Sequence, residues 1–480
     1  MAIHFKKTLL VLLAAASLAG CKKQDASVAG EVVLNHHDML ITQGPQVDEE
    51  IRLFQIANPG IKIKKTTIAG ERYPDLFALA QKSGESPDTF VVPGRPTFPE
   101  LVANGWLLPL NGFEDYKDFE KQFPPNCFVE GVNVIKGKTY SVAQNVNIPF
   151  LQLWINTKVF RDAGLVTASG AIKEPKTLDE VLAFSRQIKK SSNGTIFGLG
   201  YSGKHDPLSW FFWMNQFSGF PQEAFGLNYK TGKYEFAKHE SVKIIANTLL
   251  TMRKEGLVLP QAASVDDETA RVLFAQGKYG MLVNGSWVIN GWKQTNPEFK
   301  DYTVVPLPLV GVDKIKGYFY YGPGGASVGI SPLSKHPKEA WLWFKWQQSK
   351  EASLRWVKSG NGPSIYKEFN TPENLNSDAM ARVVAMVKLG RIGPQPGIRN
   401  PDTALVKIPN VKPDEAGILE GYLTGQITDL QAALVDLDAR KQAAFEQAVE
   451  DAKKAGAKVS TADWVFSDWD MSKDYVNKRR

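Results

Sequence analysis

The stretch that decides the fold is Phe274–Trp292, which reads FAQGKYGMLVNGSWVINGW. A helical turn ends at a glycine, and the apolar run through Val283 then predicts a short buried strand that stops at turn residues. Asn284 and Ser286 can bond hydroxyl groups, and Trp287 offers a flat apolar face beside them. Sugars need that combination, because hydroxyls surround a ring whose C–H face is weakly apolar. A tryptophan after such a turn also suits an ordinary core.

Strands and helices alternate in the region after residue 30. Hydrophobic periodicity and turn residues predict them in the order strand, helix, strand, helix, strand at residues 31–35, 47–56, 61–65, 76–83 and 87–92. This order predicts a parallel sheet with crossover helices. Ligands bind such sheets at the carboxyl ends of the strands, so we expect Asp38 and Arg95 at the rim of a site. The planar guanidinium of Arg95 suits hydroxyls or a carboxylate.

Residues 1–20 have the pattern of a lipoprotein signal peptide. Two lysines precede Leu9–Ala19, an apolar run too short to span a bilayer, which takes about 20 residues. The run ends in Leu-Ala-Gly-Cys, which resembles a bacterial lipobox, so we expect cleavage before Cys21 and lipid attachment to its sulfur. An ordinary secretory signal is the alternative. Residues 21–30 would be the lipidated tether, and the protein would lie on the extracytoplasmic face of the cell membrane (in the periplasm if the cell is Gram-negative).

Composition and charge argue against nucleic-acid binding, a disulfide and a metal site. The net charge of +7 becomes about +5 (7 − 2) without the two signal-peptide lysines, and no long block of Lys or Arg occurs, so no nucleic-acid partner is expected. With Cys21 lipidated, Cys127 has no disulfide partner and no nearby histidine, which predicts a small packed side chain. The adjacent His36 and His37 point to opposite faces of a strand, so neither a metal nor a cofactor is expected.

Several motifs follow one another in the order known for one family. They are FQIANPGIKI at 54–63, SPDTF at 86–90, YSVAQNVNIP at 140–149, LWINTK at 153–158, FAQGK to GSW at 274–287 and KHPKEAWLWF at 335–344. In this order they resemble the extracellular solute-binding proteins of the sugar class. These are the capture subunits of ABC importers, and maltodextrin-binding protein is one of them.

The resemblance implies a fold and a division of the chain. The fold is α/β with two lobes, the type II-like periplasmic-binding-protein fold, and hinge crossings near residues 148, 305 and 350 make both lobes discontinuous. Residues 31–148 plus 305–349 would form the N-terminal lobe. Residues 149–304 plus 350–480 would form the C-terminal lobe.

The resemblance also implies residues that contact the ligand. In relatives the tryptophan that matches Trp287 stacks on the ligand, and an aromatic side chain near 210–213 lies on the sugar. Asn145 and Asn147 stand where relatives often have carboxylates, so the amides favour a neutral sugar. The expected ligand contacts are Asp38, Arg95, Asn145, Asn147, Tyr201, Asp206, Trp210, Trp213, Trp287 and Tyr320.

The function implied by the resemblance is capture rather than catalysis. A monomer would bind a carbohydrate, with an oligosaccharide favoured by the many aromatic residues, and deliver it to the membrane permease and its ATPase. One alternative is a surface-anchored carbohydrate-active enzyme that uses Asp38 and Asp206 as its two carboxylates. Another is a sugar sensor or adhesin with the same lobes. The stretch Gly325–Gly329 matches the hydrolase pattern G-x-S-x-G, but its serine lies in a predicted strand instead of before a helix.

Overall fold

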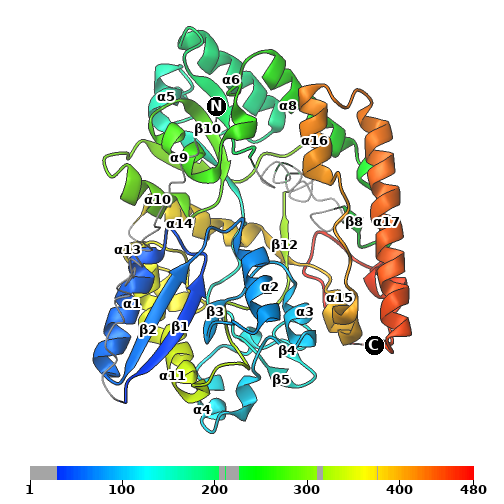
Figure 1. Ribbon diagram of the computed structural model, residues 1–480. Helices are drawn as coiled ribbons and strands as arrows, with labels where there is room; N and C mark the ends of the chain where they lie inside the picture. Colours follow the sequence, from blue (N-terminus) through cyan, green and yellow to red (C-terminus); the bar gives the residue numbers. More distant parts are fainter. Residues whose placement is uncertain are drawn as a thin grey trace, which may run out of the picture.

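A computed structural model of the protein describes residues 30–204, 211, 214, 226–310, 317–375 and 377–479. The chain forms two lobes, each built around a four-stranded sheet with helices packed on it (Figure 1). The α/β fold with two lobes that the sequence predicted is therefore confirmed. The expected signal peptide and Cys21 lie outside the described residues. Within the described ranges, no helix is both long enough and apolar enough to cross a membrane.

The first lobe contains the sheet with the strand order β13-β3-β1-β2. Its N-terminal elements are β1 (Val32–Asp38), α1 (Gly44–Ala57), β2 (Ile61–Thr67), α2 (Tyr73–Ser83), β3 (Thr89–Val91) and α3 (Phe98–Ala103). β1 is parallel to both neighbours, with Val32 opposite Ile61 and His36 opposite Thr89, so the predicted alternation of strands and helices is confirmed. α2 ends at Gly84, where a φ of +77° favours glycine.

The second lobe contains the sheet with the strand order β11-β6-β10-β7. Its strands are β6 (Gln152–Asn156), β7 (Phe197–Gly200), β10 (Tyr279–Asn284) and β11 (Tyr302–Val305). Every residue of β6 and β10 is buried, because helices cover both faces of the sheet. The helices of this part are α5 (Thr157–Asp162), α6 (Leu178–Ser191), α8 (Glu240–Lys254), α9 (Asp267–Ala275) and α10 (Val288–Thr295).

The last third of the chain packs on both lobes. β13 (Val328–Ile330) joins the first sheet antiparallel to β3, and α11 (Pro337–Gln347) packs in the first core. The helices that follow are α12 (Lys350–Lys358), α13 (Pro372–Leu375), α14 (Asp378–Ala385), α15 (Pro396–Arg399), α16 (Glu415–Thr424) and α17 (Leu430–Lys454). α16 and α17 run along one side of the molecule (Figure 1), where Leu419 and Leu434 enter the core of the second lobe.

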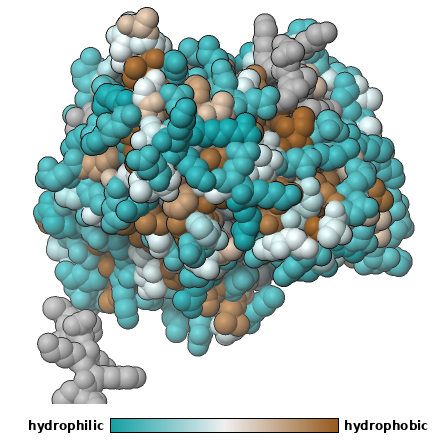
Figure 2. All heavy atoms as spheres, turned by 90° about the horizontal axis from the view of Figure 1, so that it is seen from above, coloured by the Kyte–Doolittle hydropathy of each residue, from teal (hydrophilic) through white to brown (hydrophobic). Residues whose placement is uncertain are grey.

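Short elements complete the fold. They are α4 (Tyr116–Glu120) and three two-stranded sheets, which pair β4 (Val134–Ile135) with β5 (Lys138–Thr139), β8 (Leu227–Asn228) with β9 (Lys233–Tyr234), and β12 (Phe319–Tyr321) with β14 (Gly390–Ile392). Viewed from above, polar side chains cover much of the molecule and apolar ones are scattered among them (Figure 2).

Three segments that run between the lobes bond to one another. Ser141 Oγ donates to the Val328 carbonyl at 2.7 Å, and Ser327 Oγ donates to the Val142 carbonyl at 3.0 Å. The backbone N–H of Ile365 donates to the Gln144 carbonyl at 3.0 Å. Ser327 precedes β13 instead of a helix, so its surroundings differ from those of a hydrolase nucleophile.

The segment that follows β11 packs with the second lobe. β11 pairs with β6 in the second sheet, and Leu307 and Val310 pack in the core of the second lobe. The Leu309 N–H also donates to the Lys176 carbonyl at 2.9 Å. Buried apolar side chains therefore keep this segment packed with the second lobe through residue 310.

Candidate ligand-binding site

Trp287 lies where β10 ends and α10 begins. β10 is antiparallel to β6 and parallel to β7, with Asn284 opposite Gln152 at its end. The short strand predicted at Leu282 and Val283 is confirmed and is longer than predicted. Trp287 is the residue that precedes the first turn of α10, and its side chain is partly exposed. The sheet thus carries this indole to the end of a buried strand.

Hydrogen bonds and a glycine fix the orientation of the Trp287 ring. The indole Nε1 donates to Asp267 Oδ2 at 3.3 Å, and Asn284 Nδ2 donates to Asp267 Oδ1 at 2.6 Å. Arg271 Nη1 lies 3.2 Å from Asp267 Oδ2. The six-membered ring of Trp287 lies over Gly285, where any Cβ would overlap it. Because the ring is held at its nitrogen and along one side, its orientation is set by the protein.

Asp267 is a site residue that the sequence analysis missed. It is the first residue of α9, whose N-cap is Asp266, with a side chain that accepts from the Thr269 N–H at 2.9 Å. The sequence signal for it is the pair of adjacent aspartates at the start of this helix. One carboxylate is enough to cap the helix, so the other is available for a different contact. Only the packing of α9 beside β10 shows that the second carboxylate meets Trp287.

Phe150 is the second residue that the sequence analysis missed. Its side chain is 48% exposed, and its ring centroid lies 5.3 Å from that of Trp287 with 49° between the ring planes. The strand register explains this contact. Since Asn284 lies opposite Gln152 in an antiparallel pair, residue 150 falls just beyond the end of β10, beside the turn that carries Trp287. A lone phenylalanine after a proline gives no periodic signal in the sequence.

Asn145 and Asn147 lie on the crossing segment that leads to Phe150. Both side chains are exposed. With its amide nitrogen toward the acceptors, Asn145 donates to the Pro363 carbonyl at 3.0 Å, and Asn147 Nδ2 donates to the Gly322 carbonyl at 3.4 Å. In these orientations both amides bond the other crossing segments.

The first lobe supplies Asp38 and Arg95. Asp38 is the last residue of β1 and is 0% exposed; its Oδ1 accepts from the Leu40 N–H at 3.2 Å, whereas Oδ2 has no hydrogen-bond partner among the described residues. Burial raises the pKa of the Asp38 carboxyl. The neighbouring His36 is also buried, and burial lowers its pKa to about 3. Arg95 follows β3 and its side chain is exposed.

One direct contact joins the Asp38 segment to the Trp287 segment. Gln294 Nε2, on α10, donates to the carbonyl of Thr42 at 2.6 Å. A Cβ on Gly291 would lie 3.5 Å from the Thr42 methyl group. The loop after β1 and the helix that begins after Trp287 therefore meet, and this contact brings the two lobes together beside the candidate site.

Of the remaining expected ligand contacts, Tyr201 and Tyr320 pack against other parts of the protein, and three residues lie outside the described ranges. Tyr201 is 5% exposed and packs edge to face with Phe211 at 5.2 Å between ring centroids, so in this conformation it offers a ligand little surface. Tyr320 donates to the Met471 carbonyl at 2.9 Å and contacts Trp469, which places it against the C-terminal tail. Asp206, Trp210 and Trp213 lie outside the described residues.

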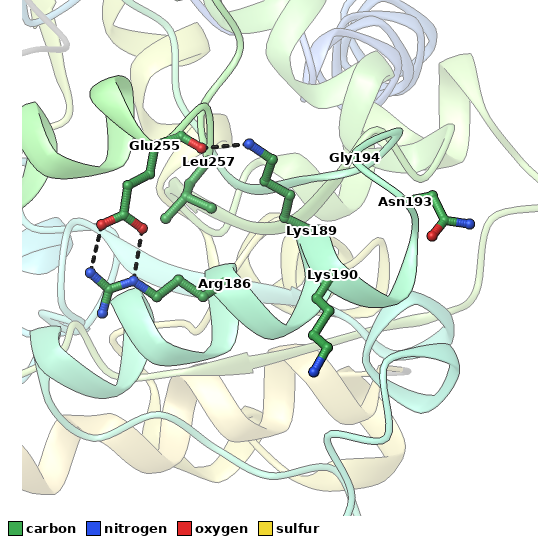
Figure 3. A pocket seen from close by; sticks show the side chains of 7 residues that line it. All are labelled: Arg186, Lys189, Lys190, Asn193, Gly194, Glu255 and Leu257. Atoms are coloured by element: carbon green, nitrogen blue, oxygen red, sulfur yellow. Dashed lines mark hydrogen bonds and ion pairs between the residues drawn. The ribbon is translucent and has the colours of Figure 1, made fainter.

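A separate hollow lies at the C-terminal end of α6 (Figure 3), with a volume of about 550 Å³. Arg186 donates to both carboxylate oxygens of Glu255 at 2.7 and 2.8 Å, and Lys189 donates to the Glu255 carbonyl at 2.6 Å. Lys190 extends away from this pair (Figure 3). These bonds tie α6 to the end of α8, and the hollow contains none of the expected ligand contacts.

No metal centre accompanies this site in the described part of the chain. Within residues 30–204, 211, 214, 226–310, 317–375 and 377–479, no three His, Cys, Asp or Glu side chains lie together as ligands of one ion. Cys127 is a buried free thiol there, as expected for a packed side chain, and burial raises its pKa to about 12.

Comparisons with known proteins agree with this architecture. A multiple sugar-binding protein of Streptococcus mutans is 25% identical over 76% of this chain and 83% of its own length. The fold matches an ABC transporter solute-binding protein of Thermotoga lettingae bound to α-D-tagatose, with a TM-score of 0.66, 19% identity and coverage of 86% of this chain and 100% of that one. It also matches the GacH receptor of Streptomyces glaucescens, with a TM-score of 0.64, 15% identity and coverage of 86% and 98%.

The family assignment rests on the sequence profile of the bacterial extracellular solute-binding proteins. That profile matches residues 37–353, which is more than half of the chain and includes the end of β1, all of β10, Trp287 and α11. The family consists of substrate-binding proteins and not of enzymes. The chain therefore belongs to the bacterial extracellular solute-binding protein family.

Proposed function

We propose that this protein captures a carbohydrate for an ABC importer, with Trp287 as the main platform for the sugar. The observation that carries the proposal is the partly exposed indole, held by Asp267 over Gly285 at the end of a buried strand. Aromatic faces stack on the apolar C–H face of a sugar, and such a fixed face loses little conformational entropy when it binds. The sugar-binding relative and the solved complex with tagatose support the same ligand class.

The proposed capture uses polar groups from both lobes. Asn145 and Asn147 would exchange their bonds to Pro363 and Gly322 for sugar hydroxyls. Asp38 is 0% exposed in this conformation, so its Oδ2 would accept a hydroxyl only after the loop beside it moves. Rotation about the crossing segments would then close the lobes over the sugar, as hinge motion does in binding proteins. The lobe division at 148/149 and 349/350 is part of this proposal.

The test is thermal unfolding and intrinsic tryptophan fluorescence against a panel of saccharides. A sugar at 100 times its dissociation constant should add about 2.7 kcal/mol to the free energy of unfolding. Trp287→Ala should then weaken binding of that sugar by tenfold or more, about 1.4 kcal/mol. The proposal fails if no sugar raises the melting temperature while a peptide or a metal ion does. Recovery of the bound sugar unchanged would separate capture from the enzyme alternative.

The proposed anchor and importer partner need tests in cells. Cys21→Ala should release the protein from the membrane fraction if its thiol carries lipid. Deleting the protein should stop growth on the sugar found in the binding assay, provided no redundant importer is present. Normal growth after deletion would contradict delivery to a permease and would favour the sensor or adhesin alternative.

A further inference from the structure

The second half of α17 belongs to a small packed unit beside the two lobes. α17 has 25 residues, which makes it about 38 Å long. Its buried residues through Leu437 enter the core of the second lobe, whereas Phe445 and Val449 pack with Val406 in a separate cluster. We call this unit the C-terminal module, and it consists of the second half of α17, α15, η8 (Pro401–Leu405) and η9 (Thr461–Trp464).

Hydrogen bonds join the parts of the C-terminal module to one another. Asn400, directly after α15, donates from Nδ2 to the Lys458 carbonyl at 2.8 Å. The Lys458 N–H in turn donates to Asp402 Oδ2 at 2.8 Å. Arg399 Nη1 donates to the Val465 carbonyl, just after η9. α15 is therefore fastened to the end of α17, and through α17 it is attached to the second lobe.

The C-terminal module touches the first lobe at a pair of glycines. Gly397 on α15 lies so close to the turn at Gly131 that a Cβ on Gly397 would be 2.5 Å from the Gly131 carbonyl oxygen. That turn is fixed in the first lobe, because Asn133 is fully buried and its Nδ2 donates to the Ser141 carbonyl at 3.2 Å. Backbone therefore meets backbone between a segment held by the second lobe and one held by the first.

A second contact lies near the glycine pair. Lys407, which follows η8, donates from Nζ to Asn104 Oδ1 at 2.8 Å, and η8 packs beside α3. Figure 1 shows α15 next to α3 and β4, at the lower end of α17 and far from α10. The C-terminal module thus joins the lobes on a different side of the molecule from the contact between Gln294 and Thr42.

We propose that the contact between Gly131 and Gly397 is a latch that limits how far the two lobes separate when no ligand is bound. If the lobes rotate apart, α15 follows the second lobe and the turn at Gly131 follows the first, so the contact breaks. Such a contact lowers the population of separated forms and raises the affinity for a ligand held by both lobes. The inference rests on the hinge motion of the proposed function and adds how that motion is regulated; it does not depend on which ligand binds.

The test adds a side chain at Gly397 in the full folded protein. Gly397 has no positive φ, and alanine is more favourable than glycine in a helix, so α15 itself accepts Gly397→Ala. The new methyl group would overlap the Gly131 carbonyl, and Gly397→Val would add more overlap. Overpacking of this kind should shift the equilibrium toward separated lobes by about tenfold.

Two measurements without ligand report that shift. Small-angle X-ray scattering should give a larger radius of gyration, with the largest increase in Gly397→Val. Hydrogen exchange at the backbone amides of residues 129–134 should be about tenfold faster, whereas exchange in β10 should stay the same. Gly112→Ala is the matched control in the first lobe, because its Cβ would meet nothing within 4 Å, and it should change neither measurement. Lys407→Ala removes the second contact without adding atoms, and should speed the same amides by about twofold even if Gly397→Val fails to fold.

Binding measurements separate the latch from the proposed function. For a sugar found in the panel, titration calorimetry should show about tenfold weaker binding in Gly397→Val. Unchanged scattering and exchange in both Gly397 variants overturn the latch, as does an unchanged affinity beside a larger radius of gyration. In either case the proposed capture stands, since the unaltered protein binds the sugar. If the unaltered protein binds no sugar, the proposed function is wrong, and scattering and exchange alone decide on the latch.

Discussion

Removing the Asp267 carboxylate tests the support of the candidate site. In Asp267→Ala, Asn284 and Trp287 lose their shared acceptor and Arg271 loses one of its two carboxylate partners. A buried donor left without an acceptor costs about 1–3 kcal/mol, and Asn284 is fully buried. Arg271 is 6% exposed but keeps Glu268 at 3.1 Å, so its loss is smaller than the 3–5 kcal/mol of a fully broken buried pair. We expect the free energy of unfolding to fall by about 3 kcal/mol in total.

The same variant should also weaken sugar binding, because the Trp287 indole would lose the bond at its nitrogen. Urea unfolding followed by circular dichroism gives the stability, and titration with the sugar found in the panel gives the affinity. Asp266→Ala is the matched control, since it removes the N-cap of α9 at a cost of about 1 kcal/mol and leaves Trp287 untouched. Asp267→Asn keeps an acceptor and should recover part of the affinity. If Asp267→Ala cost no more than Asp266→Ala and bound the sugar normally, the positioning role would be refuted.

Three further predictions follow from single side chains. Gly285→Ala should displace the Trp287 ring and weaken sugar binding by about tenfold, measured by calorimetry, because its Cβ would overlap that ring. His36 is neutral in the folded protein, with a pKa of about 3, whereas the unfolded chain takes up a proton below about pH 6.5. The free energy of unfolding should therefore fall by up to about 1.4 kcal/mol for each pH unit as the pH is lowered from 6.5 to 3. Urea unfolding at several pH values should show a weaker dependence of that free energy on pH in His36→Gln. Cys127 should resist iodoacetamide in the native protein and react on unfolding, as followed by mass spectrometry, because burial raises its pKa to about 12.

A specific result would contradict each of these three predictions. Unchanged sugar affinity in Gly285→Ala would mean that the ring does not depend on that contact. If the free energy of unfolding depended equally on pH with and without His36, the acid sensitivity would come from other groups. Asp38 acts in the opposite sense, because burial raises its pKa and its proton uptake favours the folded state as the pH falls. Rapid alkylation of Cys127 at neutral pH would show that the first lobe opens around α4.

The local pattern of the sequence determined the first lobe well. The alternation of apolar residues in Ile61–Thr67 and the glycine at 84 have one consistent structural interpretation, because strand and helix periods differ and only glycine adopts that turn easily. The sequence predicted the buried strand before Trp287 equally well. The packing of Leu307 and Val310 in the second lobe was not predicted, because the side chains around them are distant in sequence.

Motif order alone determined the family and selected Trp287 as the tryptophan to examine. Tertiary structure alone decided what surrounds that ring. Asp267 reaches it from another helix, and Phe150 reaches it from a segment 137 positions away (287 − 150), through the register of β6 against β10. Tyr201, one of the expected ligand contacts, packs in the core in this conformation. The physical reason is that burial and long-range hydrogen bonds depend on which elements pack together, and no local pattern records that packing.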